Sequence, residues 1–428
     1  MGSWHHNDRL LLLQLMTTTE YSTLGSVAAL IAQTLQSYDC DPATSRTLSS
    51  AGQGKHRPNT GKTGNRNTSV RPVRLADTQT TARRLAILIL LVTAFGLLAA
   101  CRAGTETDVP ESTTSSVLGP EHLAIVINDE DPLSKGIGEY YIAKRGIPAS
   151  NVIHVHFKPG NNVMQPRIFR TLKAAVDRQT PSPVQAYVLT WTAPYRVGCM
   201  SITTAFAAGF DEEFCAMGCK PTRTSPYFDS SSTQPFTDFN WRPTIMLAGD
   251  DLESVKELID RGVAADGTHP DGTAYLLNTS DKARNVRARF YPGIKIMQSD
   301  RFRVKPVNRN TLKHRTDIMF YFTGLASVDG IDTNTYRPGA IADHLTSAGG
   351  KLTGSKQMSS LRWLAAGATG SYGTVVEPCA FVQKFPRPNV VIDRYLNGET
   401  LLEAYWKSVE WPGQGVFIGE PLAAPFRY

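Results

Sequence analysis

The sequence has little net charge in the part where a folded domain is expected. Residues 101–428 contain 35 Lys and Arg against 33 Asp and Glu, and the basic excess of the 428-residue chain lies mainly in residues 1–100. A protein that binds nucleic acid through its phosphates needs a basic surface, so we expect no nucleic-acid partner. Cysteine is also scarce. Two of the six cysteines lie within residues 1–101, and the other four could form disulfide bonds in an exported protein: Cys199, Cys215, Cys219 and Cys379.

Long apolar runs are absent apart from Leu85–Ala100, which has 16 residues without a charge. About 20 apolar residues are needed to cross the hydrocarbon core of a bilayer, so this run is short for a membrane span. It follows Arg83 and Arg84 and is typical of a signal peptide. Residues Leu98 to Cys101 resemble the lipobox of bacterial lipoproteins, which implies a lipid on Cys101. A membrane anchor or a buried core helix is the alternative.

These features divide the chain into four parts. Residues 83–101 form the lipoprotein signal peptide, and residues 1–82 form a disordered leader that we interpret as an over-extended gene start. Residues 102–120 are polar, rich in Ser and Thr and without periodicity, and form a flexible tether. Residues 121–428 form a single α/β domain. Because Arg102 rather than Asp follows the cysteine, we expect a lipid anchor in the outer membrane, facing the periplasm.

Short apolar runs alternate with amphipathic segments throughout the domain. The apolar runs predict strands at 123–128, 152–157, 186–191, 274–279 and 317–324. The amphipathic segments predict helices at 131–146, 165–179, 250–266, 280–291 and 398–409. This alternation predicts a mostly parallel sheet flanked by helices. Residues 198–243 interrupt it and predict an irregular insertion, stapled by one disulfide or by two if Cys379 reaches it. The Cys215-x3-Cys219 spacing alone gives only weak support for zinc.

Polar residues follow several of the predicted strands. Ligands of parallel sheets bind beyond the carboxyl ends of the strands, so we expect a polar cleft at one edge of the sheet. Its candidate ligand-binding residues are Asn128, Ser134, Arg196, Asp281, Arg284 and Asp343. The alternative is that these residues cap helices and form surface ion pairs. His154 and His156 would face the same side of a strand, but no third ligand can be identified, so we expect no metal and no cofactor.

The segment 337–350 brings Asp343 and His344 close to a serine and ends in two glycines. Neighbouring residues of one helical turn cannot easily form a nucleophile and its base. The double glycine indicates a backbone that is tight or closely approached, for example by a ligand. A catalytic site would combine Cys379 as the nucleophile, His344 as the base and Glu377 or Asp343 as the orienting carboxylate. The alternatives for Cys379 are half of a disulfide or a buried thiol.

Segments such as "YVLTWTAPYRV", "SITTAFAAGFDEEFCAMGC" and "GATGSYGTVVEPCAFVQKFP" occur along residues 121–428. Together they resemble a bacterial family whose genes accompany exosortase and PEP-CTERM protein-sorting systems. The activity of that family is not established, so the resemblance implies a cellular context rather than a chemistry.

The order of "IMFYFTG", "PGAIADHLTSAGG" and a near-terminal "GEPL" is similar to that of gingipain and caspase-like cysteine peptidases. Those enzymes carry a Gly-His-Gly-type turn after one strand and a catalytic cysteine after the next. Here the first position is Gly324-Leu325-Ala326, and the second, around His344–Ser347, has no cysteine. The terminal motif is Gly419-Glu420-Pro421 in place of the usual Gly-Asp-Pro. The resemblance implies a fold, and peptidase activity does not follow from it.

The sequence therefore predicts a cell-envelope lipoprotein that binds a protein or polysaccharide chain in an exosortase-linked process. The alternatives are a peptidase-like hydrolase with a non-standard site and a structural envelope scaffold. A hydrolase requires a free Cys379 thiol near His344. A binding protein requires an open groove at the strand ends, and a scaffold requires neither.

Overall fold

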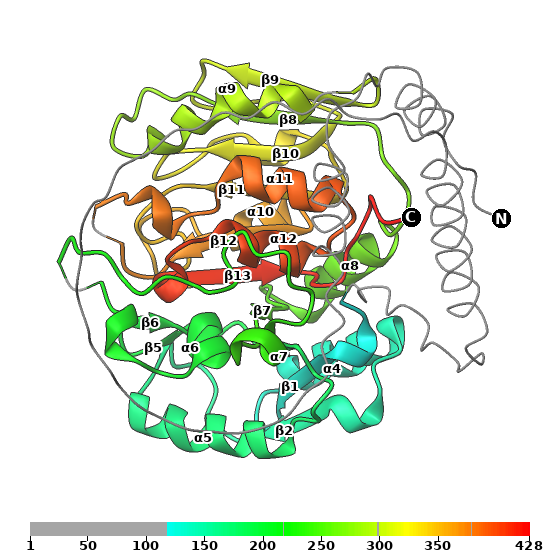
Figure 1. The fold of residues 1–428 in the computed structure, drawn as a ribbon, viewed down its shortest axis with the longest axis vertical. Coiled ribbons are helices and arrows are strands. Elements are labelled where there is room, and N and C mark those ends of the chain that lie inside the picture. Colours follow the sequence, from blue (N-terminus) through cyan, green and yellow to red (C-terminus); the bar gives the residue numbers. More distant parts are fainter. Residues whose placement is uncertain (1–117, 217, 298, 378) are drawn as a thin grey trace, which may run out of the picture. The chain divides into compact units, whose positions relative to one another are not determined.

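The computed structural model describes residues 118–428 apart from positions 217, 298 and 378. The predictions for the leader, the signal peptide, the lipidated Cys101 and most of the tether lie outside the described residues. Figure 1 shows the strands of one sheet crossing the described domain from β9 to β2, with helices packed on it. The fold is α/β with a mostly parallel sheet, as the alternation of apolar runs and amphipathic segments predicts.

Two sheets are present in the described part of the chain. The large sheet has ten strands in the order β2-β1-β4-β7-β13-β12-β11-β10-β8-β9. Its strands are β1 (Leu123–Asn128), β2 (Val152–Val155), β4 (Ala186–Leu189), β7 (Thr244–Met246), β8 (Gly272–Leu277), β9 (Phe302–Val307), β10 (Ile318–Thr323), β11 (Tyr336–His344), β12 (Gly370–Thr374) and β13 (Gly415–Gly419). The small sheet consists of β3 (Val163–Met164), β5 (Arg196–Val197) and β6 (Met200–Ser201).

One strand pair reverses the direction of the large sheet. All neighbouring strands of this sheet are parallel except β12 and β13, which are antiparallel, with Gly370 opposite Gly419. The carboxyl ends of β1, β4 and β7 therefore lie at one edge, and those of β8, β10 and β11 lie at the opposite edge. The prediction that the polar residues after the strands all meet at one edge of the sheet is therefore wrong. Apolar periodicity in the sequence carries no information on the direction of a strand within the sheet.

Helices cover both faces of the large sheet. They are α4 (Pro132–Arg145), α5 (Pro166–Gln179), α6 (Ile202–Ala208), α7 (Pro235–Phe239), α8 (Leu252–Val263), α9 (Tyr291–Ile294), α10 (Leu361–Ala365), α11 (Pro388–Leu396) and α12 (Leu401–Ser408). On one face, Tyr395 of α11 contacts Phe320 of β10. The next residue of that strand, Tyr321, points to the other face and contacts Trp363 of α10. The strands of this sheet are thus buried on both sides, which explains their continuous apolar runs.

The predicted insertion 198–243 contains α6 and α7 and is stapled twice. Cys199 pairs with Cys215 inside it, and Cys219 pairs with Cys379, with Cα atoms 5.4 and 5.5 Å apart. Of the two alternatives left open by the sequence, one disulfide or two, the structure has two, and Cys379 reaches the insertion. None of the helices in the described residues is long and apolar enough to cross a membrane.

The segment 337–350 differs from its predicted form. β11 continues to His344, so Asp343 and His344 point to opposite faces of the sheet instead of sharing a helical turn. Residues 280–291 are also not a regular α-helix, since half of them form the 3-10 helix η4 (Asn285–Phe290). A Cβ atom on Gly350 would lie 2.2 Å from the carbonyl oxygen of Gly373, so it is strand β12 that approaches the second glycine closely.

Candidate functional site

The ends of β8, β10 and β11 form a polar edge where the peptidase-like motif is expected. These strands are neighbours and parallel, with Thr323 of β10 opposite His344 of β11. Gly324 and the residues after His344 are thereby placed side by side. A Cβ atom on Gly324 would lie 2.0 Å from the carbonyl oxygen of Arg284, so the loop after β8 crosses directly over this position. We call this region the β10–β11 edge.

A hydrogen-bonded network occupies the β10–β11 edge. Arg284 forms an ion pair with Asp281 at 2.8 Å and donates to the hydroxyl of Thr346 at 3.1 Å. Thr346 donates in turn to the side-chain oxygen of Gln357, which also accepts from the backbone of Ala348. Two of the predicted ligand-binding residues, Asp281 and Arg284, therefore contact each other. Asp281 and the Nε and Nη1 atoms of Arg284 already bind protein groups, so the network holds three loops together.

A buried ion pair lies beneath this network. Asp343 Oδ1 is 2.5 Å from Arg287, and both side chains are almost fully buried. Arg287 also donates to the carbonyl oxygen of Thr323 at 2.7 Å. Burial raises the pKa of Asp343 to about 6, although Arg287 opposes this shift. Asp343 is thus a core residue that joins β11 to the segment after β8, and it has no open surface for a ligand.

His344 is also fixed inside the protein. Its Nδ1 accepts a hydrogen bond from the indole of Trp363 at 2.9 Å, so its Nε2 carries the proton that is donated to the carbonyl of Met358 at 3.1 Å. Burial lowers the pKa of His344 to about 4. A base needs a free nitrogen facing the reacting group, and neither ring nitrogen is free.

The other two predicted catalytic residues are part of one tight turn. Glu377 is buried, accepts hydrogen bonds from the backbone of Cys379 and Ala380, and lies 3.6 Å from the ammonium of Lys384. Burial lowers the pKa of Lys384. Cys379 is bonded to Cys219, so it has no thiol to act as a nucleophile in this form of the protein. The structure does not assemble the predicted catalytic site.

The predicted ligand-binding residues of the first half have structural contacts. Asn128 is fully buried, and its side chain bonds the backbone N–H and C=O of Phe157. Ser134 accepts from the backbone of Asn128 and bonds Thr190. Arg196 lies in the small sheet, where its Nε atom is buried without a hydrogen-bond partner. The predicted common groove of Asn128 with Arg284 is wrong, since the two residues lie at opposite edges of the sheet.

Sequence analysis missed several residues that organise the β10–β11 edge. Gln357 and Trp363 come from distant segments of the chain, where they bind Thr346 and His344, and neither had a signal in the sequence. Arg287, the partner of Asp343, was within reach, because it stands with Arg284 among the polar residues that follow the predicted strand 274–279.

An open groove lies elsewhere, between β2 and α5. One hollow of about 760 Å³ is lined by His154, Val155 and His156 of the β2 region and by α5 residues that include Ile168. A second hollow of about 450 Å³ shares His156 and Ile168 and adds Val163. Ile168 is 52% exposed and Val163 is 39% exposed. We call the two hollows together the β2 groove.

The two outer strands of the large sheet differ in how they are protected. β9 contains Lys305 and Pro306, and a lysine or a proline on an edge strand hinders pairing with a further strand. β2, at the other end, has the sequence Val-Ile-His-Val and neither device. Within the described residues no strand pairs with its outer side. The exposed His154 and His156 both approach the carboxylate of Asp129, which directly follows the neighbouring strand β1, at 2.8 and 3.6 Å.

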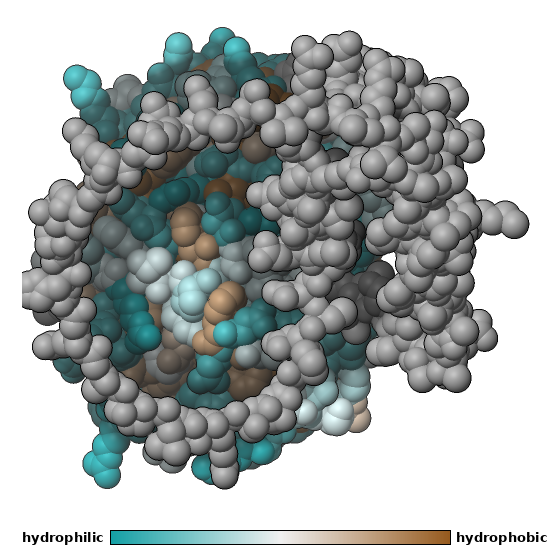
Figure 2. Space-filling model, viewed as in Figure 1, coloured by the Kyte–Doolittle hydropathy of each residue, from teal (hydrophilic) through white to brown (hydrophobic). Residues whose placement is uncertain are grey.

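Hydrophobic and hydrophilic side chains are mixed on the face of the molecule seen in Figure 2, where the visible apolar groups are scattered among polar ones. Among residues 118–428, with the three omitted positions set aside, no group of three or more His, Cys, Asp or Glu side chains is arranged to hold a metal ion. No family model, no curated protein and no solved structure matches the chain. The site must therefore be interpreted from its own geometry.

Proposed function

We propose that this protein binds an extended segment of a partner protein, which pairs with the outer side of β2 and fills the β2 groove. The observation that carries the proposal is an unprotected edge strand lying beside an apolar hollow. Strand addition uses the backbone groups of an exposed edge for affinity and neighbouring pockets for the side chains of alternate residues.

The lining of the β2 groove indicates the chemistry of the partner. Ile168, Leu172 and Ala175 of α5 supply an apolar wall. Arg167 and Lys158 are exposed, and no Asp or Glu lines either hollow. A segment in which apolar residues alternate with acidic residues would place one set against α5 and the other set near these cations. Charged groups of this kind contribute mostly to specificity and to the rate of association.

The cellular context of this binding is also a proposal. A lipid on Cys101 would tether the domain to the cell envelope, most simply at the periplasmic side of the outer membrane, and the domain would act there in an exosortase-linked process. Two disulfides in the domain are compatible with an oxidising compartment. The mass of the mature N-terminus tests this part, because a mature species that retains residues 1–100 would contradict it.

We further propose that the domain has a caspase-like fold that does not act as a cysteine peptidase. The adjacency of the β10 and β11 ends, where such peptidases carry their histidine and cysteine, supports the likeness of fold. Gly324-Leu325-Ala326 offers no histidine, His344 has both ring nitrogens bonded, and Cys379 is in a disulfide. These facts support binding over hydrolysis.

A peptide-binding measurement tests the main proposal. The probe is a fluorescent peptide of eight residues that alternates Val and Glu, and the comparison peptide alternates Val and Lys. We expect the acidic peptide to bind, the basic peptide to bind at least tenfold more weakly, and Ile168→Asp to weaken binding of the acidic peptide at least tenfold.

The matched control is Ile296→Asp, since Ile296 is another exposed isoleucine and does not line the β2 groove. This variant should bind as the wild type does. Equal binding by wild type and Ile168→Asp would refute the β2 groove as the site. Binding of an acidic polysaccharide that is insensitive to Ile168→Asp would favour the polysaccharide alternative.

A further inference from the structure

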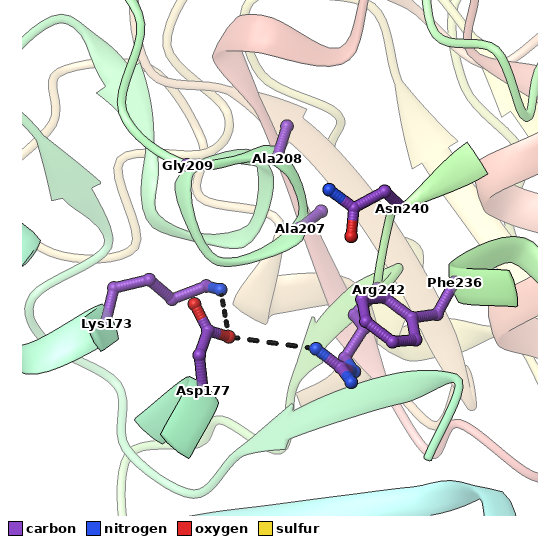
Figure 3. Close-up of a pocket in the computed structure, with 8 residues that line it drawn as sticks. All are labelled: Lys173, Asp177, Ala207, Ala208, Gly209, Phe236, Asn240 and Arg242. Carbon is purple, nitrogen blue, oxygen red and sulfur yellow. Dashed lines mark hydrogen bonds and ion pairs between the residues drawn. The ribbon is translucent and has the colours of Figure 1, made fainter. Parts of the chain in front are cut away.

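A second cavity lies on the other side of α5 from the β2 groove. It has a volume of about 370 Å³, and Lys173, Asp177, Phe236, Asn240 and Arg242 line it together with the end of α6. Figure 3 shows the side chains of Lys173 and Arg242 pointing toward Asp177 from two sides. Cavities of a few hundred Å³ with a few converging polar groups are typical of small-molecule sites. We call this cavity the α5–α6 pocket.

The charges of the α5–α6 pocket are not balanced. Its lining holds two cations, Lys173 and Arg242, and a single carboxylate, Asp177. Asp177 Oδ1 is 2.5 Å from Lys173 and 3.8 Å from Arg242, and it also accepts from the hydroxyl of Tyr187 at 2.9 Å. One carboxylate oxygen thus accepts two hydrogen bonds, from Lys173 and Tyr187, and also lies within ion-pair distance of Arg242. Burial lowers the pKa of Lys173, whereas Asp177 opposes this shift and the nearby Arg242 adds to it.

The donors of the pocket are held in place before any ligand arrives. Arg242 has a side chain only 8% exposed, and its Nε donates to the carbonyl oxygen of Val184 at 3.1 Å. Its guanidinium lies 3.2 Å from the centre of the Phe236 ring, which fixes the plane of the group. The amide of Asn240 faces the pocket in Figure 3. A preorganised guanidinium beside an ammonium is a favourable partner for a carboxylate.

The other walls of the pocket restrict the ligand. Ala207, Ala208 and Gly209 have little or no side chain, and the ring of Phe236 closes another side. From this combination of surplus positive charge and small apolar walls, we propose that the α5–α6 pocket binds a small organic carboxylate with a compact apolar body. This site is separate from the β2 groove and does not depend on the proposed peptide binding.

Titration calorimetry of the purified protein at low ionic strength tests the proposal, because salt screens such contacts. Benzoate is the probe, and benzamide is its uncharged counterpart of the same shape. We expect benzoate to bind at least tenfold more tightly than benzamide. Lys173→Met should weaken benzoate binding at least tenfold, and Asp177→Asn should strengthen it severalfold, because it removes the competing carboxylate but keeps an acceptor for Tyr187.

Arg178→Met is the matched control, since it removes a cation from the same helix that lines neither this pocket nor the β2 groove, and it should leave benzoate binding unchanged. Circular dichroism melting of each variant confirms folding, and the opposite effects of Lys173→Met and Asp177→Asn cannot both come from loss of fold. Equal binding of benzoate and benzamide would overturn the proposal. Unchanged binding in Lys173→Met, or binding of inorganic phosphate alone, would also overturn it.

Discussion

The two disulfides should stabilise the domain by different amounts, because they close loops of very different length. Cys199 and Cys215 are 16 residues apart, whereas Cys219 and Cys379 are 160 residues apart. The chain-entropy relation gives a stabilisation of ~3 kcal/mol for the short loop and ~5 kcal/mol for the long loop. The two loops do not overlap in the sequence, so their contributions to the free energy of unfolding should add. The difference of ~2 kcal/mol depends only on the ratio of the loop lengths.

Urea unfolding of two double variants, each with and without a reductant, measures these two contributions. Cys199→Ala with Cys215→Ala leaves only the long-loop disulfide, and Cys219→Ala with Cys379→Ala leaves only the short-loop disulfide. Comparing the oxidised and reduced forms of one variant cancels the cost of the alanines themselves. We expect reduction to lower the free energy of unfolding by ~5 kcal/mol in the first variant and ~3 kcal/mol in the second. An equal or larger loss in the second variant would refute the loop-entropy reasoning.

Three further predictions concern the core. Gly350→Ala should destabilise the protein by at least about 2 kcal/mol, because the new Cβ would meet the Gly373 carbonyl. The control Gly293→Ala, which has open space around it, should change the stability by less than about 1 kcal/mol. Equal shifts of the melting temperature in the two variants would contradict this prediction. Glu420→Gln should lower the free energy of unfolding, measured in urea, by about 3–5 kcal/mol, because buried Glu420 accepts two hydrogen bonds from the largely buried Arg145. A loss below about 1 kcal/mol would show that Asp266 suffices as the partner of Arg145. The folded-state pKa of His344, about 4, is below its unfolded value, so its contribution is present above about pH 6.5 and is lost as the pH falls toward 4. His344→Gln should therefore lose about 3 kcal/mol less than wild type between pH 7 and pH 4, and parallel stability curves would contradict this.

Local patterns predicted most of the individual elements of the domain. The run Leu123–Asn128 and the amphipathic segment after it correspond to β1 and α4, whose Asp131 caps the helix and whose Gly146 ends it in the left-handed conformation. These features depend on residues close in sequence, so periodicity and capping rules suffice. β11 was misjudged because Asp343 and His344 are polar residues within a strand. Their partners, Arg287 and Trp363, come from distant segments and offset part of the cost of burying them.

The candidate sites were harder to predict than the elements. The polar residues after the strands are present, but Asn128 and Arg284 are separated because β12 and β13 pair in opposite directions. The β2 groove and the α5–α6 pocket had no sequence motif. Both arise where α5 lies against its neighbours, and Ile168 and Lys173 appear in the sequence only as ordinary members of an amphipathic helix.

The sequence by itself determined the α/β class, most of the individual strands and helices, and the even set of cysteines available for pairing. Those properties follow from composition and from patterns within about twenty residues. Only the tertiary structure decided which edge each strand end faces, which cysteines pair and which polar side chains are buried. Each of these depends on contacts between segments far apart in the chain, where the free energy of packing and hydrogen bonding is shared by residues that no local pattern connects.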